Sequence, residues 1–405
     1  MAVRNWLRGM FLVLFALVAV APRAQAQADT SGPTKVEVYG FAMLDMGYDF
    51  NQNDPAWFDV VRPTKLPSFE DEFGKDGRFY AGVRQSRLGV KMWTPTSAGK
   101  LYTVFEFEMF GVGVDAGQTT IRLRHAYGEL GHFGAGQTWS PFMDIDVFPN
   151  TVEYWGPTGM AFFRNVQFRW MPKMGATAVT LALERPGASG DPGDYGDRVE
   201  LSGIQTRLQY PDLSAHVRFN RDWGHVQLAG IVRSIKWDDT LADAFELGGD
   251  EVGWGFNAST NLKIKKDTFR GSVVYGEGVE NYMNDAPVDI GIQSNGTDPV
   301  TPVVGKPLPL LGISAFYDRT WSEKWTSSFG YSRIDIDNSD LQSPSAFHLG
   351  QYAVINMMYY PAKNVMLGPE FQWGSRENNS DGFISTDRRV QFSAKYNFSH
   401  IMGGE

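Results

Sequence analysis

Alternation of apolar and polar residues with a period of two is the feature that most constrains the fold of this chain. In the stretch 103–109 (TVFEFEM), Phe105 and Phe107 fall on one face, and Glu106 and Glu108 fall on the other. The same alternation recurs in four further stretches, at 87–92, 121–128, 365–373 and 390–398. This period is typical of β-strands with one apolar and one polar face. It fits two designs: a soluble sandwich with its apolar face inward, or a membrane barrel with its apolar face on lipid.

The hydropathy pattern narrows the choice of membrane-spanning structure. Beyond the N-terminus, no stretch contains 18 consecutive apolar residues, so helical membrane spans are not predicted. Only helices and closed barrels satisfy their backbone polar groups in lipid, so a spanning form of this chain must be a barrel.

The N-terminus has the pattern of a secretory signal peptide. Arg4 and Arg8 precede the uncharged stretch 10–21, and small residues follow at 24–26 (AQA) and 26–28 (AQA). The apolar stretch is too short to span a bilayer, and the small residues provide a cleavage site. We therefore predict a signal peptide over 1–28 and a β-barrel over 29–405.

The lengths of the predicted connections distinguish the barrel from the sandwich. Short connections are expected at 94–100, 131–132, 173–174, 220–224, 263–267, 321–324 and 361–363. Long ones are expected at 51–78, 112–118, 141–163, 186–212, 238–250, 279–309, 336–346 and 377–387. Short and long connections alternate along the chain, as the tight periplasmic turns and long outer loops of outer-membrane barrels do. We therefore predict an all-β, antiparallel transmembrane barrel of about 16 strands, with short periplasmic turns and long extracellular loops.

One segment tests the strand count. The stretch 198–209 also has strand character, but a further crossing there would place the short 220–224 turn outside and the long 238–250 loop inside. We therefore assign 186–212 to one outer loop that contains some strand. Sixteen strands, an even number, then leave both termini on the periplasmic side.

Composition excludes several classes of function. The sequence has no cysteine, which rules out disulfide scaffolds, thiolate zinc sites and cysteine nucleophiles. Its net charge of −9 gives no support to nucleic-acid binding. It contains neither HExxH nor Gly-x-Ser-x-Gly. Asp335, Asp337 and Asp340 resemble a calcium loop only weakly, because the glycine and the distal glutamate are missing, so we predict no metal site.

The polar strand faces and one long loop supply the predicted pore-lining residues. Segment 141–163 is the candidate constriction loop, and it carries Asp144, Asp146 and Glu153. The basic residues predicted on the opposite wall are Arg87, Lys91, Arg122, Arg124, Arg169, His216 and Arg218. Wall cations facing loop acids would set up a transverse field that selects ions by charge. Arginine also stays charged and offers a fork for carboxylates, so these residues favour anions.

The role or placement of two pairs of arginines stays open. Arg122 and Arg124 also fit salt bridges with Glu106 and Glu108 on the adjacent strand, which would weaken anion selectivity. Arg84 and Arg164 point outward unless a bulge or a loop position reorients them. In 121–128, Ile121, Leu123 and Tyr127 are expected together on the apolar face.

Several segments carry a family resemblance: 38–41 (VYGF), 84–89 (RQSRLG), 136–140 (GQTWS), 155–159 (WGPTG) with 163–164 (FR), 224–230 (GHVQLAG) and the final aromatic strand. Together they resemble the trimeric outer-membrane porins of Gram-negative bacteria, and most of all the DcaP-type family. The resemblance covers essentially the whole mature chain. Two departures are the lack of a coiled-coil segment before Val36 and the residues that follow Phe398.

The resemblance implies an integral outer-membrane channel that passes small hydrophilic solutes by passive diffusion. It implies a homotrimer in contact with outer-membrane lipid and lipopolysaccharide, and a preference for small anions such as dicarboxylates. Such a channel needs no cofactor and no catalytic residue. A nonspecific porin, a sugar-selective channel, a barrel enzyme such as a lipase or protease, and a plugged structural barrel remain alternatives.

Overall fold

The computed structural model describes residues 32–403 of this chain. Within that range no helix is long and apolar enough to cross a membrane. The signal peptide predicted at 1–28 lies outside the described residues.

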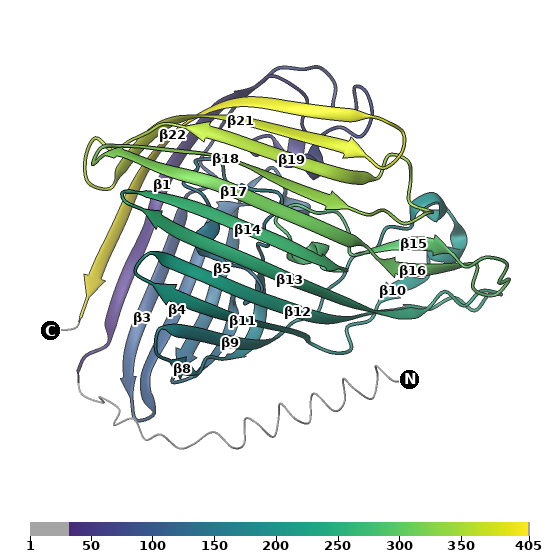
Figure 1. Cartoon of the computed structure of the whole chain (residues 1–405), viewed down its shortest axis with the longest axis horizontal. Coiled ribbons are helices and arrows are strands. Elements are labelled where there is room, and N and C mark those ends of the chain that lie inside the picture. Colours follow the sequence, from purple (N-terminus) through teal and green to yellow (C-terminus); the bar gives the residue numbers. More distant parts are fainter. Residues whose placement is uncertain (1–31, 404–405) are drawn as a thin grey trace.

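Sixteen antiparallel strands form a closed ring (Figure 1). They are β1 (Lys35–Asp49), β3 (Arg87–Thr96), β4 (Gly99–Phe110), β5 (Thr119–Leu130), β6 (Phe133–Trp139), β7 (Arg164–Trp170), β9 (Thr177–Glu184), β11 (Asp212–Arg221), β12 (Gly224–Asp239), β13 (Gly249–Ile264), β14 (Asp267–Glu277), β17 (Pro309–Ser322), β18 (Trp325–Ile336), β19 (Phe347–Asn356), β21 (Val365–Asn378) and β22 (Ile384–Met402). The last strand closes the ring on the first, from Val36 opposite Met402 to Asp49 opposite Arg389. The predicted strand number is therefore confirmed.

The remaining elements are short. β2 (Arg78–Gly82), β8 (Lys173–Met174) and β20 (Met358–Tyr359) extend the ladders of β1, β9 and β18. β10 (Ile204–Thr206), β15 (Ile290–Ser294) and β16 (Val303–Pro307) lie outside the ring. The 3-10 helices are η1 (Pro55–Trp57), η2 (Pro63–Lys65), η3 (Gly113–Asp115), η4 (Ile145–Val147), η5 (Gly193–Tyr195), η6 (Val199–Leu201) and η7 (Glu280–Tyr282).

The strands are inside out relative to a soluble protein. Phe105 is 47% exposed on the outer face, whereas its polar neighbours Glu106 and Glu108 are buried. Leu228 and Phe256 likewise face outward from β12 and β13, while Gln227 is buried toward the interior. Because the apolar faces point away from the centre, the pattern belongs to a lipid-facing barrel and not to a sandwich.

Most predicted connections fall where expected, with three corrections. Lys173 and Met174 pair with β9, so the predicted 173–174 turn is strand, and the chain reverses just after it. The predicted long loop 377–387 is short, because β21 continues to Asn378 and β22 starts at Ile384. The 279–309 loop contains the β15–β16 hairpin, which the alternation did not indicate. The assignment of 186–212 as one loop with some strand agrees with β10 lying outside the ring.

A β-bulge corrects the predicted face of Tyr127. Glu106 pairs with His125 and Phe107 pairs with Leu123, so Arg124 is the extra residue of β5. A bulge places two consecutive residues opposite one and shifts the alternation by one position. Ile121 and Leu123 therefore face outward as predicted, whereas Tyr127 is buried on the inner side.

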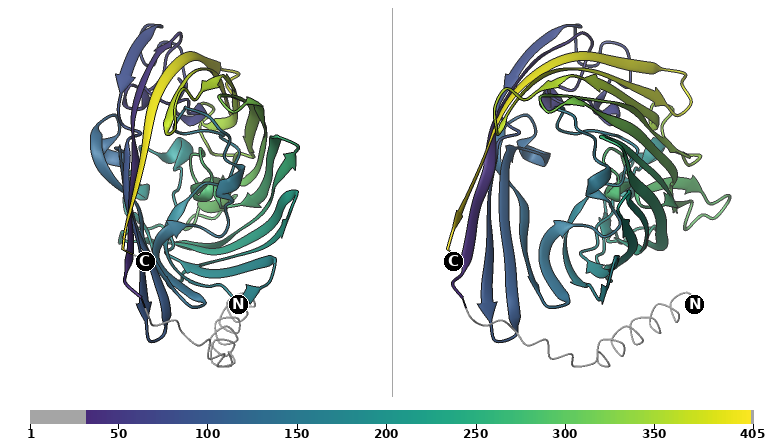
Figure 2. Two further views of the ribbon diagram at one scale, coloured as in Figure 1. Left: turned by 90° about the vertical axis from the view of Figure 1, so that its left-hand side faces the viewer. Right: turned by 60° about the vertical axis from the view of Figure 1, so that its left-hand side comes forward.

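Two loops fill part of the barrel interior with apolar side chains. Phe142 and Met143 from the β6–β7 connection pack with Val279 and Tyr282 from the β14–β17 connection and with the wall residue Ile231. Figure 2 shows the β6–β7 segment inside the ring of strands. The interior is therefore filled in part by loops that pack against the wall.

Candidate functional site: a cavity between the inner loop and a basic wall

The β6–β7 connection is fastened to the inner wall at widely separated strands. Asp144 lies 2.6 Å from His225 Nε2 and accepts a hydrogen bond from Ser259 at 2.8 Å. Near the other end of the segment, the Gly159 N–H donates to Ser332 Oγ at 2.8 Å. The segment 140–163 therefore crosses from the β12–β13 wall to the β18 wall.

Glu153 holds the middle of this segment in place. Its carboxylate accepts hydrogen bonds from the N–H groups of Val61 at 3.1 Å and Trp155 at 3.0 Å, and from that of Gly156. The Val152 and Glu153 N–H groups in turn donate to the Glu370 carboxylate, at 2.9 and 3.0 Å. Burial, reinforced by the nearby Glu370, raises the pKa of Glu153 to about 8. Glu153 thus anchors two loops to the wall.

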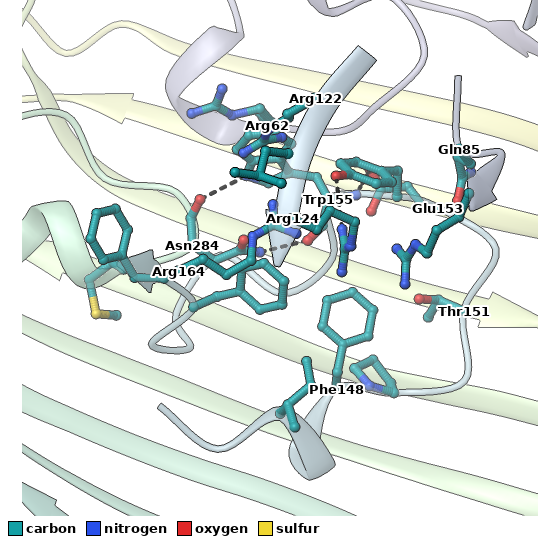
Figure 3. A pocket seen from close by; sticks show the side chains of 18 of the residues that line it. Arg62, Gln85, Arg122, Arg124, Phe148, Thr151, Glu153, Trp155, Arg164 and Asn284 are labelled. Atoms are coloured by element: carbon teal, nitrogen blue, oxygen red, sulfur yellow. Dashed lines mark hydrogen bonds between the residues drawn. The ribbon is translucent and has the colours of Figure 1, made fainter. Parts of the chain in front are cut away.

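A cavity of about 610 Å³ lies between this segment and the β3–β5 wall. Its lining includes five arginines and one lysine: Arg62, Arg87, Arg122, Arg124, Arg164 and Lys395. In Figure 3, Arg122, Arg124 and Arg164 lie toward one side of the cavity and Phe148 lies toward the other. The cavity is therefore the place where wall cations meet the inner loop.

Four of these arginines share two carboxylates, and we call Arg87, Arg122, Arg124 and Arg164 the arginine cluster. Arg124 makes the closest contacts, with Nε 2.6 Å from Glu106 and Nη1 2.5 Å from Glu108. Glu108 also lies 3.4 Å from Arg87, 3.6 Å from Arg122 and 3.7 Å from Arg164.

The two carboxylates are already occupied by other donors as well. Tyr39 donates to Glu106 at 2.7 Å, and Tyr154 donates to Glu108. Two acids therefore face four cations, and the arginine cluster retains a positive surplus.

Donors of the arginine cluster remain unused within the described part of the chain. Arg164 Nη1 and Arg87 Nε are buried and have no hydrogen-bond partner there. The Arg87 and Arg122 side chains are 24% and 27% exposed, so both are open to the cavity. An anion that enters the cavity would find guanidinium donors at hand.

Two further cations line the cavity beside aromatic rings. The Arg62 guanidinium lies 4.2 Å from the ring centroid of Trp57 and 4.0 Å from that of Trp155, and its Nε is 2.8 Å from Asp285. The Lys395 ammonium lies 4.0 Å from the Phe41 ring centroid. Sequence reasoning missed both, because Arg62 lies in a long loop without periodicity and Lys395 was treated only as part of a polar strand face.

The other predicted wall cations lie away from this cavity, and most pair with an acid. Lys91 lies 3.6 Å from Glu37, and Arg169 lies 3.0 Å from Glu129. His216 Nδ1 lies 3.1 Å from the Pro141 carbonyl oxygen. None of these three lines the cavity.

The predicted loop acids divide between two places: Glu153 lines the cavity, whereas Asp144 and Asp146 face another of the predicted wall cations, Arg218. Asp144 lies 3.3 Å from Arg218 Nη1, and Asp146 also pairs with Arg218, on the β11 wall. The physical reason is that these acids find a guanidinium and an imidazole nearer than the arginine cluster. Asp144, Asp146 and His225 offer ligand atoms within 4.8 Å of one another, but Arg218 already supplies the positive charge that a metal would bring.

The two arginines left uncertain by alternation both point inward. Arg164 is the first residue of β7 and lies over the Trp139 ring, at the end of the inner segment. Arg84 lies between β2 and β3, where it pairs with Asp59 at 2.7 Å and donates to the carbonyls of Gly111 and Gln118. A loop position reorients Arg84, which fastens loops together and does not line the cavity. The Asp335 of the weak calcium pattern pairs with Arg333 at 2.5 Å.

Comparison with known proteins places this barrel in a family. The sequence profile described as "DcaP outer membrane protein" matches residues 23–398. No curated protein sequence matches the chain.

Solved structures agree with the fold. The outer membrane channel DcaP of Acinetobacter baumannii superposes with a TM-score of 0.73 at 23% identity, over 90% of this chain and 97% of that chain. An anion-selective porin from Comamonas acidovorans has a TM-score of 0.59 at 10% identity, over 90% and 100%. The trimer form of the Vibrio cholerae outer membrane protein OmpT has a TM-score of 0.51 at 14% identity, over 90% and 99%. These likenesses support the barrel, and the profile spans nearly the whole chain: this protein belongs to the DcaP outer membrane protein family.

Proposed function

We propose that this outer-membrane porin is a passive channel with a preference for small anions, including dicarboxylates. The observation that carries the proposal is the positive surplus of the arginine cluster, in which four guanidiniums share Glu106 and Glu108. Arginine keeps its charge at any physiological pH, so this surplus persists in a partly desolvated cavity. A fixed positive potential raises the local concentration of anions and repels cations.

Segment 141–163, within the β6–β7 connection, is the proposed constriction loop. It crosses the interior and forms one side of the cavity, so a solute must pass between it and the arginine cluster. The dicarboxylate preference rests on two further cations in the same cavity. Arg62 and Lys395 offer a second carboxylate a partner while the first is held by the arginine cluster.

Bilayer electrophysiology tests the proposal. Under a KCl gradient, the wild-type reversal potential should indicate anion preference, and an Arg87→Gln/Arg122→Gln variant should lower the chloride-to-potassium permeability ratio about threefold or more. Lys91→Gln/Arg169→Gln is the matched control, because it removes two interior cations that pair individually with acids outside the cavity. A smaller effect of the control supports a local surplus. Cation preference in the wild type would overturn the proposal, and absence of conductance would favour a plugged barrel.

Dicarboxylate permeation needs a second measurement. With succinate replacing chloride on one side, the wild type should pass succinate more readily relative to acetate than the Lys395→Gln variant does. Equal ratios in the two proteins would leave an anion channel without the dicarboxylate preference.

We further propose that the barrel forms a homotrimer. Large apolar side chains cover the outer face of β2, β3 and β5, including Phe79, Leu88 and Ile121. At the tip of the β4–β5 loop, Val114 is almost fully exposed, as a residue that contacts a neighbouring barrel would be in an isolated chain. Native mass measurement in mild detergent should give three chains per particle, and a monomer would contradict the assembly.

A further inference from the structure

The cavity has two chemically different walls. One is the arginine cluster, on β3, β5 and β7. The other is built by the constriction loop, whose Phe148, Phe162 and Phe163 line the same cavity with Ile145 of η4 and Met283 just after η7. Of the predicted loop acids, Asp144 and Asp146 are absent from this lining, because they are bound to the β11–β13 wall, whereas Glu153 is part of it together with Glu280.

The apolar wall is held in a fixed position. The Phe148 and Phe162 ring centroids lie 5.7 Å apart, and Phe162 makes an edge contact of 5.0 Å with Trp139. Gly156 provides the space for Phe148: a Cβ there would lie 2.5 Å from Phe148 Cζ, and its φ of +83° also suits glycine. The loop backbone is thus shaped to admit the Phe148 ring.

These rings keep partial exposure within an otherwise polar passage. Phe148, Phe162 and Phe163 are half-buried, whereas the neighbouring Phe142 and Met143 are sealed in the interior core. An exposed apolar wall gains free energy when a solute covers it, in proportion to the apolar area covered. A compact anion contacts the arginine cluster only, but an anion with an apolar body contacts both walls.

We propose that this cavity is a binding subsite for small amphipathic anions, which carry a carboxylate at one end and an aromatic or branched apolar body at the other. The carboxylate meets the arginine cluster, where Arg164 Nη1 has no partner in the described residues. The apolar body covers Phe148 and Phe162. This inference rests on the proposed anion preference and adds a second selection, by shape and hydrophobicity, among solutes of equal charge.

Benzoate and acetate make the simplest probe pair, because they share one carboxylate and differ in the apolar body. Each is added to a bilayer that carries chloride current through the full-length wild-type protein, and the half-blocking concentration is measured. Benzyl alcohol serves as the neutral probe with the same ring. We expect benzoate to block at about tenfold lower concentration than acetate, and benzyl alcohol to block weakly.

Substitutions then locate the effect. Phe148→Ala should reduce the advantage of benzoate to about threefold or less. Phe148→Leu keeps an apolar side chain, and should retain an intermediate advantage if the alanine variant assembles poorly. Phe256→Ala is the matched control, because Phe256 is 64% exposed on the outer face of β13.

The outcomes separate this inference from the proposed function. Equal block by benzoate and acetate in an anion-selective wild type overturns the amphipathic subsite and leaves the anion channel standing. Equal block by benzyl alcohol and benzoate also overturns it, since the cavity would then bind apolar bodies without regard to charge. A wild type without anion preference overturns the proposed function itself.

Discussion

The barrel interior contains two clusters of charge with opposite imbalance. In the arginine cluster, four cations share two acids beside an open cavity. The second cluster, which we call the acid cluster, is Glu184, Asp212, Glu280 and Asp289 around Arg233. Arg233 lies 3.1 Å from Asp212 and 2.7 Å from Asp289, and every side chain in this cluster is almost fully buried, with Glu280 at the edge of the same cavity.

The two imbalances are resolved in different ways. In the loop part of the acid cluster, burial raises the pKa of Glu280 and Asp289, which shifts the balance of these acids toward the protonated form. A guanidinium keeps its proton in all conditions relevant to a cell, so the arginine cluster cannot lose its charge by a change of protonation. It remains near water instead, with Arg87 and Arg122 reaching the cavity. A lasting surplus of charge inside this barrel therefore has to be built from arginine.

The role of each cluster follows from this difference. Arg233 also donates to the carbonyls of Gly278, at 2.6 Å, and Gly187, and so joins the β9–β11 and β14–β17 loops to the wall. The acid cluster has a structural role, because it links these loops to the wall. The arginine cluster leaves donors unused and faces open space, which suits it to act on passing solutes.

The largest effect that would test this contrast is the loss of Arg233. Arg233→Met leaves Asp212, Asp289 and two loop carbonyls without their main partner, so we expect a loss of about 3–5 kcal/mol of stability. Heat-induced unfolding followed by gel mobility and circular dichroism should show a clear fall in transition temperature. Arg207→Met is the control, since Arg207 is half exposed in its pair with Asp238. If both variants have the same transition temperature as the wild type, the acid cluster does not stabilise the attachment of the loops.

The same substitution made in each cluster gives a second, smaller test. Glu108→Gln removes an acid that four arginines share, and should raise the chloride-to-potassium permeability ratio about twofold. Glu280→Gln replaces a carboxyl whose pKa is already raised by burial, so it should leave selectivity unchanged and alter stability by less than about 1 kcal/mol.

Reversal potentials and thermal unfolding measured on both variants check this pair of expectations. A large selectivity change from Glu280→Gln would mean that the acid cluster keeps its charge and acts on solutes. An unchanged ratio in Glu108→Gln would mean that the arginine cluster is already neutralised by groups around it.

Local alternation was sufficient to predict the barrel, because one apolar face per strand is a repeated, short-range signal. Alternation failed at Tyr127, where the bulge at Arg124 shifts the alternation of β5 by one position. A bulge depends on the pairing with β4, so the sequence of β5 alone does not reveal it. The β15–β16 hairpin was not predicted for a related reason. It is a short element within a long loop, and its buried residues pack against other loops.

The candidate site could be predicted only in part. The arginines of β3 and β5 follow from alternation, and the sequence predicts the pairing of Arg122 and Arg124 with Glu106 and Glu108 as an alternative to pore lining. The structure shows that the pairs exist but are too few to neutralise the arginines. The apolar wall of Phe148 and Phe162 and the contribution of Arg62 depend on how long loops fold back, which no local pattern specifies.

The smallest expected effect, a dependence on pH, sharpens the contrast between the two kinds of charge. Glu153 has its pKa raised from 4.5 to about 8, so the folded protein binds its proton more tightly than the unfolded chain does. Its contribution to the attachment of the proposed constriction loop is therefore fully present below about pH 4.5, and is lost as pH rises through about 8. Current noise from loop motion should increase between pH 6 and pH 9, and Glu153→Gln should flatten that dependence. The reversal potential should change little over the same range, because guanidiniums do not titrate there. If the reversal potential changed with pH in the same way as the current noise, titrating acids, and not the arginine cluster, would set the preference for anions.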